Sequence, residues 1–224
     1  MIAPRVRISV YDLDRTITSL PTWTPFLLHA ARAVAPWRLA ALPVVGLAAL
    51  THADRDRRKE RMHRLILGPA LGEATATRLA EDFATRLTRD HIRPGARAQI
   101  AADRAEGRRI VIATAAHAFY ARAIADRLGV ADLVATRAKR DAAGDITPML
   151  DGPNCYGAAK RAMLERWLAD ADIARQDAHI RFQSDHVSDA PSFAWADEPI
   201  AVNPHARLRA LARARGWRIV DWGA

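Results

Sequence analysis

The stretch YDLDRTIT (Tyr11–Thr18) begins at the end of an apolar, β-branched run, VRISVY (Val6–Tyr11), which predicts a short buried strand. Asp12 and Asp14 stand one residue apart directly after this strand. Successive side chains of an extended chain point to opposite faces, so we expect both carboxylates on the same side. Carboxylates held this close repel each other unless a cation lies between them or one of them keeps a proton. The first arrangement makes a Mg²⁺ site, and the second provides one carboxylate for attack and one acid to protonate a leaving group.

The composition is that of a globular chain with a large excess of arginine. Half of the 224 residues are hydrophobic, and the formal net charge of +9 favours anionic partners such as phosphorylated metabolites, anionic lipid or nucleic acid. Only three lysines are present, Lys59, Lys139 and Lys160, so each is a candidate for a specific role. Cys155 is the sole cysteine, which excludes an intramolecular disulfide and a multi-cysteine metal site. The N-terminus leaves no room for a cleavable signal before the first strand, so we expect a cytoplasmic protein.

After Gly95 strands alternate with helices, which is typical of a parallel sheet with helical crossovers. We predict strands over Arg109–Ala113, His179–Gln183 and Pro199–Val202. Leu133–Lys139 and Thr147–Leu150 flank the turn DAAGD and predict a hairpin. The predicted helices in this half of the chain are Ala96–Ala105, Ala121–Leu128 and Ala158–Ala169.

Between the first strand and Gly95 the pattern changes to helices without clear strands. The candidate helices are Phe26–Val34, Trp37–Leu50, Arg57–Ile66 and Ala74–Ile92, with breaks near Pro36, Gly68–Pro69 and Pro94–Gly95. We therefore expect a discontinuous α/β core, residues 1–18 and 94–224, with a helical cap, residues 19–93, inserted between its two parts.

Polar side chains follow the strands of the predicted sheet, where ligands bind in open parallel sheets. Carboxylates, a hydroxyl and a lysine at one sheet edge provide the charge neutralisation and in-line positioning that phosphoryl transfer needs. The candidates are Asp12 and Asp14 after the first strand, Thr114 after RRIVIA, Lys160 near a helix start, and Asp185 and Asp189 in SDHVSD.

The ordered set DLDRT, Thr114, Lys160 and DHVSD resembles the haloacid dehalogenase (HAD) superfamily of phosphatases. The helical insertion is similar to the C1 cap of subfamily IB, the phosphoserine-phosphatase-like hydrolases, and the tail AVNPHARLRALARARGW is similar to the end of that subfamily. The resemblance implies a Rossmann-like HAD core with a parallel sheet plus an inserted helical C1 cap. It also implies a Mg²⁺-dependent phosphomonoester hydrolase that acts through an aspartyl-phosphate.

Carried over residue by residue, the resemblance implies a role for each motif residue. Asp12 is the expected nucleophile, and Asp14 the acid that protonates the leaving oxygen and then accepts a proton from the attacking water. Thr114 is expected to hydrogen-bond the phosphoryl oxygens. Lys160 supplies a compact positive charge to the nucleophile and the phosphate, a task that suits an ammonium better than a guanidinium.

The expected metal site also takes its residues from the motifs. Mg²⁺ is expected to bind Asp12, the backbone carbonyl of Asp14, Asp185 and waters, because hard cations prefer oxygen ligands. Asp189 is expected to orient the metal waters or Lys160.

Simpler structural explanations exist for each of these residues. Asp12 and Asp14 are alternatively turn residues, Thr114 and Asp189 helix caps, and Lys160 a solvated helix residue, but this explanation leaves the ordered set of motifs unexplained. His117, His186 and His205 are expected to be surface or structural residues, because HAD chemistry needs no histidine.

The cap bears on the substrate. Phosphoserine phosphatases of this subfamily typically carry a glutamate nine residues after the nucleophile, and here that position is Pro21. Because no acidic residue lies in Ser19–Phe26, a buried ammonium lacks its counter-charge and L-phosphoserine is disfavoured. Arg61, in the basic run RDRRKERMHR (Arg55–Arg64), is a candidate substrate-binding residue.

The apolar segment Phe26–Leu50 allows two interpretations. Interruptions by charged residues and prolines argue against a transmembrane helix. Trp23, Trp37 and the basic run that follows suit a helix pair lying at the inner face of the membrane, and a phospholipid phosphomonoester of the phosphatidylglycerophosphate or lysophosphatidate type is then a candidate substrate. The simpler interpretation, an internally packed cap, favours a small phosphorylated metabolite.

Two further hypotheses stay open at this point. The first is a non-catalytic basic protein that binds membrane or nucleic acid through the arginine-rich cap. Such a protein has no need of the motif carboxylates, so the motifs weigh against it and we expect no nucleic-acid partner. Phosphoryl transfer to an acceptor other than water needs the same residues as hydrolysis.

Overall fold

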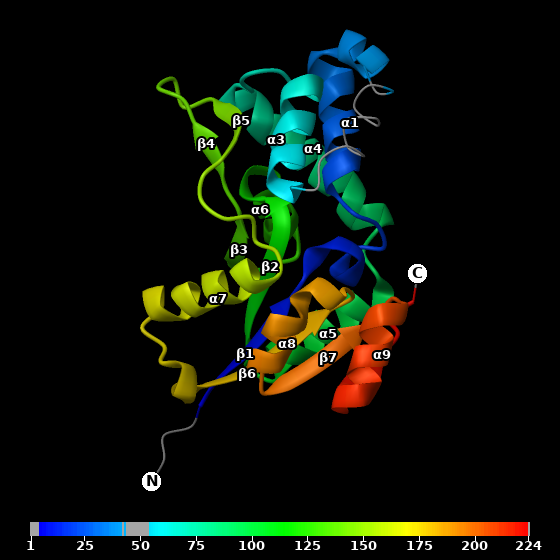
Figure 1. Ribbon diagram of the computed structural model, residues 1–224, viewed down its shortest axis with the longest axis vertical. Helices are drawn as coiled ribbons and strands as arrows, with labels where there is room; N and C mark the ends of the chain where they lie inside the picture. Colours follow the sequence, from blue (N-terminus) through cyan, green and yellow to red (C-terminus); the bar gives the residue numbers. More distant parts are fainter. Residues whose placement is uncertain (1–4, 42, 44–53, 224) are drawn as a thin grey trace.

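A six-stranded parallel sheet forms the body of the protein, in the spatial order β3-β2-β1-β6-β7-β8 (Figure 1). The computed structural model describes residues 5–41, 43 and 54–223. Every neighbouring pair of strands runs parallel, and Val10 of the central strand β1 lies opposite Val111 and Phe182. The predicted α/β fold is therefore confirmed. The strands are β1 (Val6–Tyr11), β2 (Arg109–His117), β3 (Asp132–Thr136), β6 (Ala178–Ser184), β7 (Glu198–Val202) and β8 (Arg218–Val220).

Helices cover both faces of this sheet because successive strand residues point into two different hydrophobic clusters. In β1, Ile8 and Val10 pack with the helices on one face, whereas Tyr11 packs with those on the other. In Figure 1, α8 and α9 lie in front of the sheet and α5 lies behind it. The front helices are α7 (Ala158–Asp170), α8 (Ala190–Trp195) and α9 (Ala206–Arg215), and those behind are α5 (Pro94–Ala105) and α6 (Ala118–Arg127).

The helices inserted after β1 stand above the carboxyl ends of the strands (Figure 1). The two connections to the body run side by side, because Thr18 and Ile92 form an antiparallel bridge and the Ser19 N–H donates to the His91 carbonyl at 2.9 Å. The domain boundaries at residues 18/19 and 93/94 stay a prediction. The inserted elements are α1 (Trp23–Val34), the short helical segment η2 (Pro36–Ala41), α3 (Arg55–Ile66) and α4 (Glu73–Asp90).

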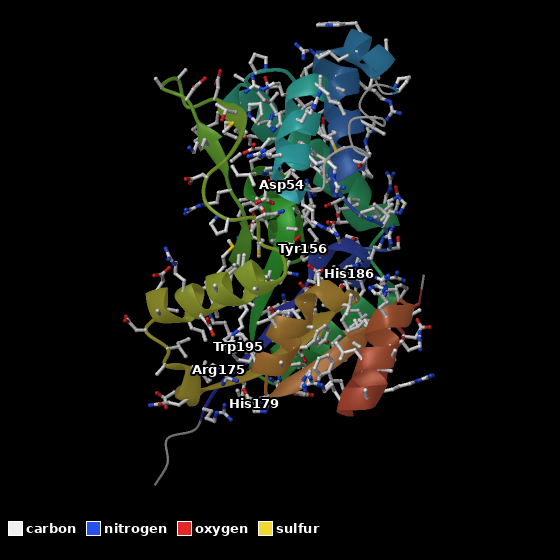
Figure 2. All side chains as sticks on the ribbon, viewed as in Figure 1. Asp54, Tyr156, Arg175, His179, His186 and Trp195 are labelled. Carbon is white, nitrogen blue, oxygen red and sulfur yellow. The ribbon has the colours of Figure 1, made fainter. Side chains whose placement is uncertain are left out.

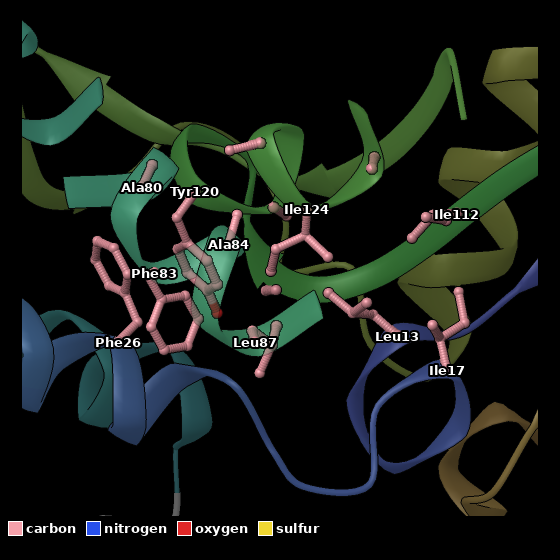
Figure 3. Close-up of a cluster of buried hydrophobic side chains, with 14 of the residues drawn as sticks. Leu13, Ile17, Phe26, Ala80, Phe83, Ala84, Leu87, Ile112, Tyr120 and Ile124 are labelled. Atoms are coloured by element: carbon pink, nitrogen blue, oxygen red, sulfur yellow. The ribbon is translucent and has the colours of Figure 1, made fainter. Parts of the chain in front are cut away.

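An aromatic cluster holds the inserted helices on the body (Figure 3). Phe26 of α1 stacks on Tyr120 of α6 with ring centroids 4.4 Å apart, and Phe83 of α4 meets Phe26 edge-on at 5.5 Å. All three side chains are buried. Truncating one such aromatic residue typically costs about 3–5 kcal/mol, so this contact keeps the cap helices in a defined position over the sheet.

The predicted hairpin is wrong in its first arm. Residues 132–136 form β3, the outer strand of the main sheet, paired in parallel with β2. Only β4 (Ala138–Arg140) pairs antiparallel with β5 (Ile146–Leu150). A short apolar run fits a parallel edge strand as well as a hairpin arm, so sequence pattern alone does not separate the two.

Other elements differ from the predictions at their ends or were missed. The strand predicted over Arg109–Ala113 continues to His117, and α8, α9 and β8 had no predicted counterpart. Of the helix predicted over Trp37–Leu50, residues up to Ala41 form part of η2, and residues 42 and 44–50 lie outside the described residues. Within the described parts of the chain, no helix is both long and apolar enough to cross a bilayer.

Candidate active site

The chain reverses sharply after β1. A single wide helical turn, η1 (Leu13–Ile17), follows Asp12 and is closed by a 3.0 Å hydrogen bond between its ends. Inside it Arg15 has a φ of +61°, in the left-handed region that most residues avoid. The reversal returns the Thr16 hydroxyl to the end of β1, 3.3 Å from Oδ2 of Asp12. Backbone strain of this kind persists only where surrounding contacts hold it, and it is frequent at functional sites.

Lys160 joins two of the predicted carboxylates. Its side chain is buried, and Nζ donates to Oδ1 of Asp12 at 2.8 Å and to Oδ2 of Asp189 at 2.7 Å. The Ser184 hydroxyl donates to the same Asp189 oxygen at 2.7 Å. These side chains come from the end of β1, the first turn of α7 and the segment that follows β6, so the tertiary fold brings them together at the carboxyl edge of the sheet.

Asp185 joins this group through Thr16. The Thr16 hydroxyl lies 3.3 Å from Oδ1 of Asp185 and accepts a hydrogen bond from the Asp185 backbone N–H at 3.0 Å. The same hydroxyl contacts Asp12, so the two carboxylates flank one small group. The structure thus brings Asp12 and Asp185 close together, as a shared cation requires.

The cluster carries more negative charge than the Lys160 ammonium balances. Burial raises the pKa of Asp12 above its usual range against the opposing effect of Lys160, and Asp189 and Asp185 raise it further. Burial, helped by Asp189, raises the pKa of Asp185 to about 6. Burial alone lowers the pKa of Lys160, but the carboxylates of Asp12 and Asp189 outweigh it and raise that pKa. The lysine therefore stays charged, and an additional cation near the carboxylates stabilises their ionised forms.

The donors present fit a hard divalent cation. Oδ1 of Asp189 is buried and has no hydrogen-bond partner among the described residues, so the site has unsatisfied acceptor capacity. In the described ranges, no group of three or more His, Cys, Asp or Glu side chains is placed to hold a metal ion by itself. A hard divalent cation such as Mg²⁺ is commonly held by one or two carboxylates and keeps several waters, and the neighbouring carboxylates of Asp12 and Asp185 fit this requirement. Asp189, already bonded to Lys160, suits the orienting role.

Asp14 is held by the start of the cap. Its Oδ1 accepts from both the backbone N–H (2.8 Å) and the hydroxyl (2.7 Å) of Thr22, which immediately precedes α1. The Tyr120 hydroxyl lies 3.0 Å from the same Thr22 hydroxyl. Burial raises the pKa of Asp14, whereas the two Thr22 hydrogen bonds lower it. Sequence reasoning missed Thr22, because nothing in the pattern shows which hydroxyl the chain reversal brings to Asp14.

Thr114 lies inside β2 rather than at a helix start. Its hydroxyl is buried and accepts a hydrogen bond from the Ala116 N–H at 3.0 Å. The alternative explanation of Thr114 as a helix cap is therefore wrong, because the strand continues to His117 and α6 begins at Ala118. Pairing with β3 is interrupted between Thr114 and His117, so the backbone leaves the regular ladder next to the site.

Lys59 is the cap residue that sequence reasoning did not assign. From α3 its Nζ donates to the Ala115 carbonyl, directly after Thr114, and to Oδ1 of Asn154 at 3.1 Å. The first turn of α3 points toward the body, and Figure 2 shows Asp54, the residue before this helix, above Tyr156 and His186. Arg61, the predicted substrate-binding residue of this helix, is exposed and does not line the adjoining cavity. The rarity of lysine was the one signal that singled out Lys59.

Four of the eight histidines form two pairs. His63 and His117 are buried near Trp23, and their ring nitrogens have no hydrogen-bond partner among the described residues. Burial lowers the pKa of His63 to about 4, so it is neutral at ordinary pH. His186 and His205 pack ring to ring at 4.5 Å and accept backbone hydrogen bonds after β6 and before α9. These contacts agree with structural roles.

Solved structures share the fold of this chain. A solved protein of unknown function from Bordetella pertussis Tohama I is 27% identical, with a TM-score of 0.84 over 98% of this chain and 100% of that chain. A phosphoserine phosphatase solved as a phospho-aspartyl intermediate analogue is 17% identical, with a TM-score of 0.65 over 98% and 94% of the two chains, which shows a common fold.

Curated relatives match over part of their length. Histidinol-phosphatase of Neisseria meningitidis is 25% identical over 133 residues, which are 59% of this chain and 60% of the relative. Phosphoserine phosphatase SerB1 of Mycobacterium tuberculosis is 32% identical over 160 residues, 70% of this chain and 49% of the relative. The chain thus spans about half of the length of these relatives. The haloacid dehalogenase-like hydrolase family model matches residues 10–194, and the chain therefore belongs to that family.

Proposed function

We propose that the protein is a Mg²⁺-dependent phosphomonoester hydrolase that acts through an aspartyl-phosphate on Asp12. The observation that carries this proposal is the buried Lys160 ammonium between Asp12 and Asp189, with Asp185 on the same Thr16 hydroxyl. The names of the relatives, histidinol-phosphatase and phosphoserine phosphatase, support hydrolysis of phosphomonoesters. HAD phosphatases are generally metal-dependent, and the donors here suit Mg²⁺.

The chain's own residues account for both chemical steps. In the first, a carboxylate oxygen of Asp12 forms a bond to phosphorus while the bond to the leaving oxygen breaks, and Asp14 gives its proton to that oxygen. In the second, Asp14 takes a proton from water, whose oxygen attacks phosphorus and releases the Asp12 carboxylate. Lys160 and the Thr114 hydroxyl stabilise the phosphoryl oxygens. A bound divalent cation supplies the remaining charge neutralisation.

A small phosphorylated metabolite is the favoured substrate. The cap helices pack on the body through buried aromatic side chains. The cavity between α3, β2 and the segment before α7 measures about 120 Å³. L-Phosphoserine stays disfavoured, because Ser19–Phe26 carries no carboxylate to neutralise its ammonium.

One observation favours a phospholipid phosphomonoester as the second candidate. Trp37, on η2, is 70% exposed. Exposed tryptophan suits a membrane interface. Co-sedimentation with anionic vesicles tests this candidate, with Trp37→Ser as the variant expected to bind less. Equal recovery of both proteins in the supernatant speaks against it.

The decisive experiment measures phosphate release from a generic aryl phosphate with Mg²⁺. We expect Asp12→Asn to lower turnover by roughly 10³-fold or more, because it removes the nucleophile. EDTA is expected to abolish activity, and added Mg²⁺ to restore it. Asp177→Asn, at an exposed position far from the site, is the matched control and is expected to behave as the wild type. Full activity of Asp12→Asn rejects the mechanism.

A further inference from the structure

A small cavity lies between α3, the end of β2 and the segment before α7, next to Thr114. It measures about 120 Å³, and its walls include Arg55, Arg58 and Lys59 of α3 together with Trp23, Asn154 and Tyr156. It is separate from the Lys160 position, where the transferred phosphoryl group is expected. Three of its walls are cations and none is a carboxylate.

Lys59 is a half-buried cation whose bonded partners are neutral. Its Nζ donates to the Ala115 carbonyl and to Oδ1 of Asn154, and it makes no ion pair with a carboxylate of the described chain. Asp56, on the same helix, instead accepts from Nδ2 of Asn154 at 2.8 Å. Burial lowers the pKa of Lys59 to about 8, against the opposing effect of Asp14 and Asp56. A charge partly withdrawn from water without a counter-ion is destabilising, so this position favours the binding of an anion.

Two arginines on the same side of α3 add to this charge. Arg58 is half-buried, and its guanidinium makes no hydrogen bond or ion pair with the described residues. The Arg55 guanidinium lies 4.2 Å from the centroid of the Tyr156 ring. Arg57, on the outer side of the helix, is paired with Asp54 instead. The unbalanced cations of the first two turns of α3 therefore face the cavity.

The position of the cavity connects it with the leaving group. Ala115 directly follows the phosphoryl-binding candidate Thr114, and the charge of Lys59 opposes the burial that raises the pKa of Asp14, the expected leaving-group acid. We propose that the cavity is a second anion subsite, in which Lys59 and Arg58 bind a carboxylate or phosphate carried by the substrate's leaving group. This inference rests on the proposed function, and it defines the substrate as a small phosphomonoester with a second anion and no neighbouring amine.

The test compares phosphomonoesters that differ only in their far end: 2-phosphoglycolate, 2-hydroxyethyl phosphate, phosphoethanolamine and 1,2-ethanediol bisphosphate. We expect kcat/KM for the carboxylate ester or the bisphosphate to exceed that for the hydroxyl ester by roughly 10- to 100-fold, the range of a hydrogen bond between charged groups. The amine is expected to be the poorest substrate. The carboxylate and bisphosphate arms decide which anion the subsite prefers.

Variants on α3 assign the effect to residues. Lys59→Met and Arg58→Met are each expected to lower the ratio of the two kcat/KM values toward one, and Lys59→Arg to retain most of it. Arg57→Met, on the same helix but 78% exposed, is the matched control and is expected to keep the wild-type ratio. If Lys59→Met does not fold, Arg58→Met decides, because the Arg58 guanidinium makes no hydrogen bond or ion pair with the described residues.

A binding measurement separates this inference from the proposed function. Calorimetry measures the affinity for 3-phosphonopropionate and for propylphosphonate, neither of which is hydrolysed. We expect 3-phosphonopropionate, which carries the carboxylate, to bind roughly 10-fold or more tightly than propylphosphonate. Equal binding of the two compounds, or an unchanged preference in both Lys59→Met and Arg58→Met, overturns the subsite. Failure to release phosphate from any ester, with the binding preference intact, overturns the hydrolase instead.

Discussion

Replacing Thr22 by valine tests whether the start of the cap positions the leaving-group acid. The Thr22 hydroxyl and N–H both donate to Oδ1 of Asp14, and Oδ2 has no hydrogen-bond partner among the described residues. With Oδ1 occupied by two donors, the acidic proton is expected on Oδ2, which is then the oxygen that gives its proton to the leaving group. Valine has nearly the same shape as threonine, so Thr22→Val removes one donor while the backbone N–H stays.

The expected size of the effect follows from the bond that is lost. A hydrogen bond to a charged group contributes about 1.5–3 kcal/mol, which corresponds to roughly 10- to 100-fold in rate if the bond acts in the transition state. The loss applies only where the leaving oxygen needs a proton. We therefore expect Thr22→Val to lower kcat on an alkyl phosphate by this factor and to change kcat on p-nitrophenyl phosphate far less, because a nitrophenolate leaves without protonation.

The assay compares steady-state kcat for the two esters in the wild type, Thr22→Val and Thr22→Ser. The serine variant keeps the hydroxyl and is expected to retain most of the alkyl-phosphate rate, whereas a merely structural role predicts equal losses on both esters. Thermal denaturation controls for the Tyr120 hydroxyl, which also loses a neighbour in Thr22→Val. Equal slowing of both esters, or a serine variant as slow as the valine variant, refutes the positioning role.

Three further changes test other parts of the structure. Lys160→Met is expected to lower kcat by roughly 100- to 1,000-fold, because it removes a preorganised charge, and Lys160→Arg is not expected to restore it; a near-wild-type rate in either variant contradicts the assignment. The pKa of Lys59 lies near 8 instead of its ordinary 10.5, so the unfolded chain binds more protons between these values and the free energy of unfolding rises with pH across that window. Urea unfolding at pH 7.5 and pH 10 is expected to show a rise larger by roughly 1–3 kcal/mol in the wild type than in Lys59→Met, and parallel pH profiles of the two proteins count against the buried charge. Asp103 is buried, accepts from the Tyr11 hydroxyl at 2.5 Å and pairs with Arg181, so Asp103→Ala is expected to lower the free energy of unfolding by about 3–5 kcal/mol in urea denaturation; a loss below 1 kcal/mol indicates that water replaces the carboxylate.

The local sequence pattern was sufficient to predict an element where the environment of its residues follows from their neighbours in the chain. The β-branched run Val6–Tyr11 is β1 with the same limits, and its last four residues are buried, as a central strand of a parallel sheet requires. The parallel topology then implies that residues after successive strands meet at one edge, and the structure places Asp12 and Asp185 on one hydroxyl there. The family was recognisable for the same reason, since its motifs are short and lie in a set order.

Tertiary packing decided what periodicity leaves open. Helical spacing shows that Arg55, Arg58 and Lys59 share a side of α3. It does not show whether that side faces solvent or the body of the protein. The contacts of Lys59 with Ala115 and Asn154 place it against the body. Likewise, residues 132–136 fit either a hairpin or a parallel edge, and only β2 supplies the partner that makes them β3. Sequence therefore determined the elements and the chemistry at their ends, whereas contacts between distant segments determined which charges are buried, and burial is what gives Lys59 and Lys160 their distinct electrostatics.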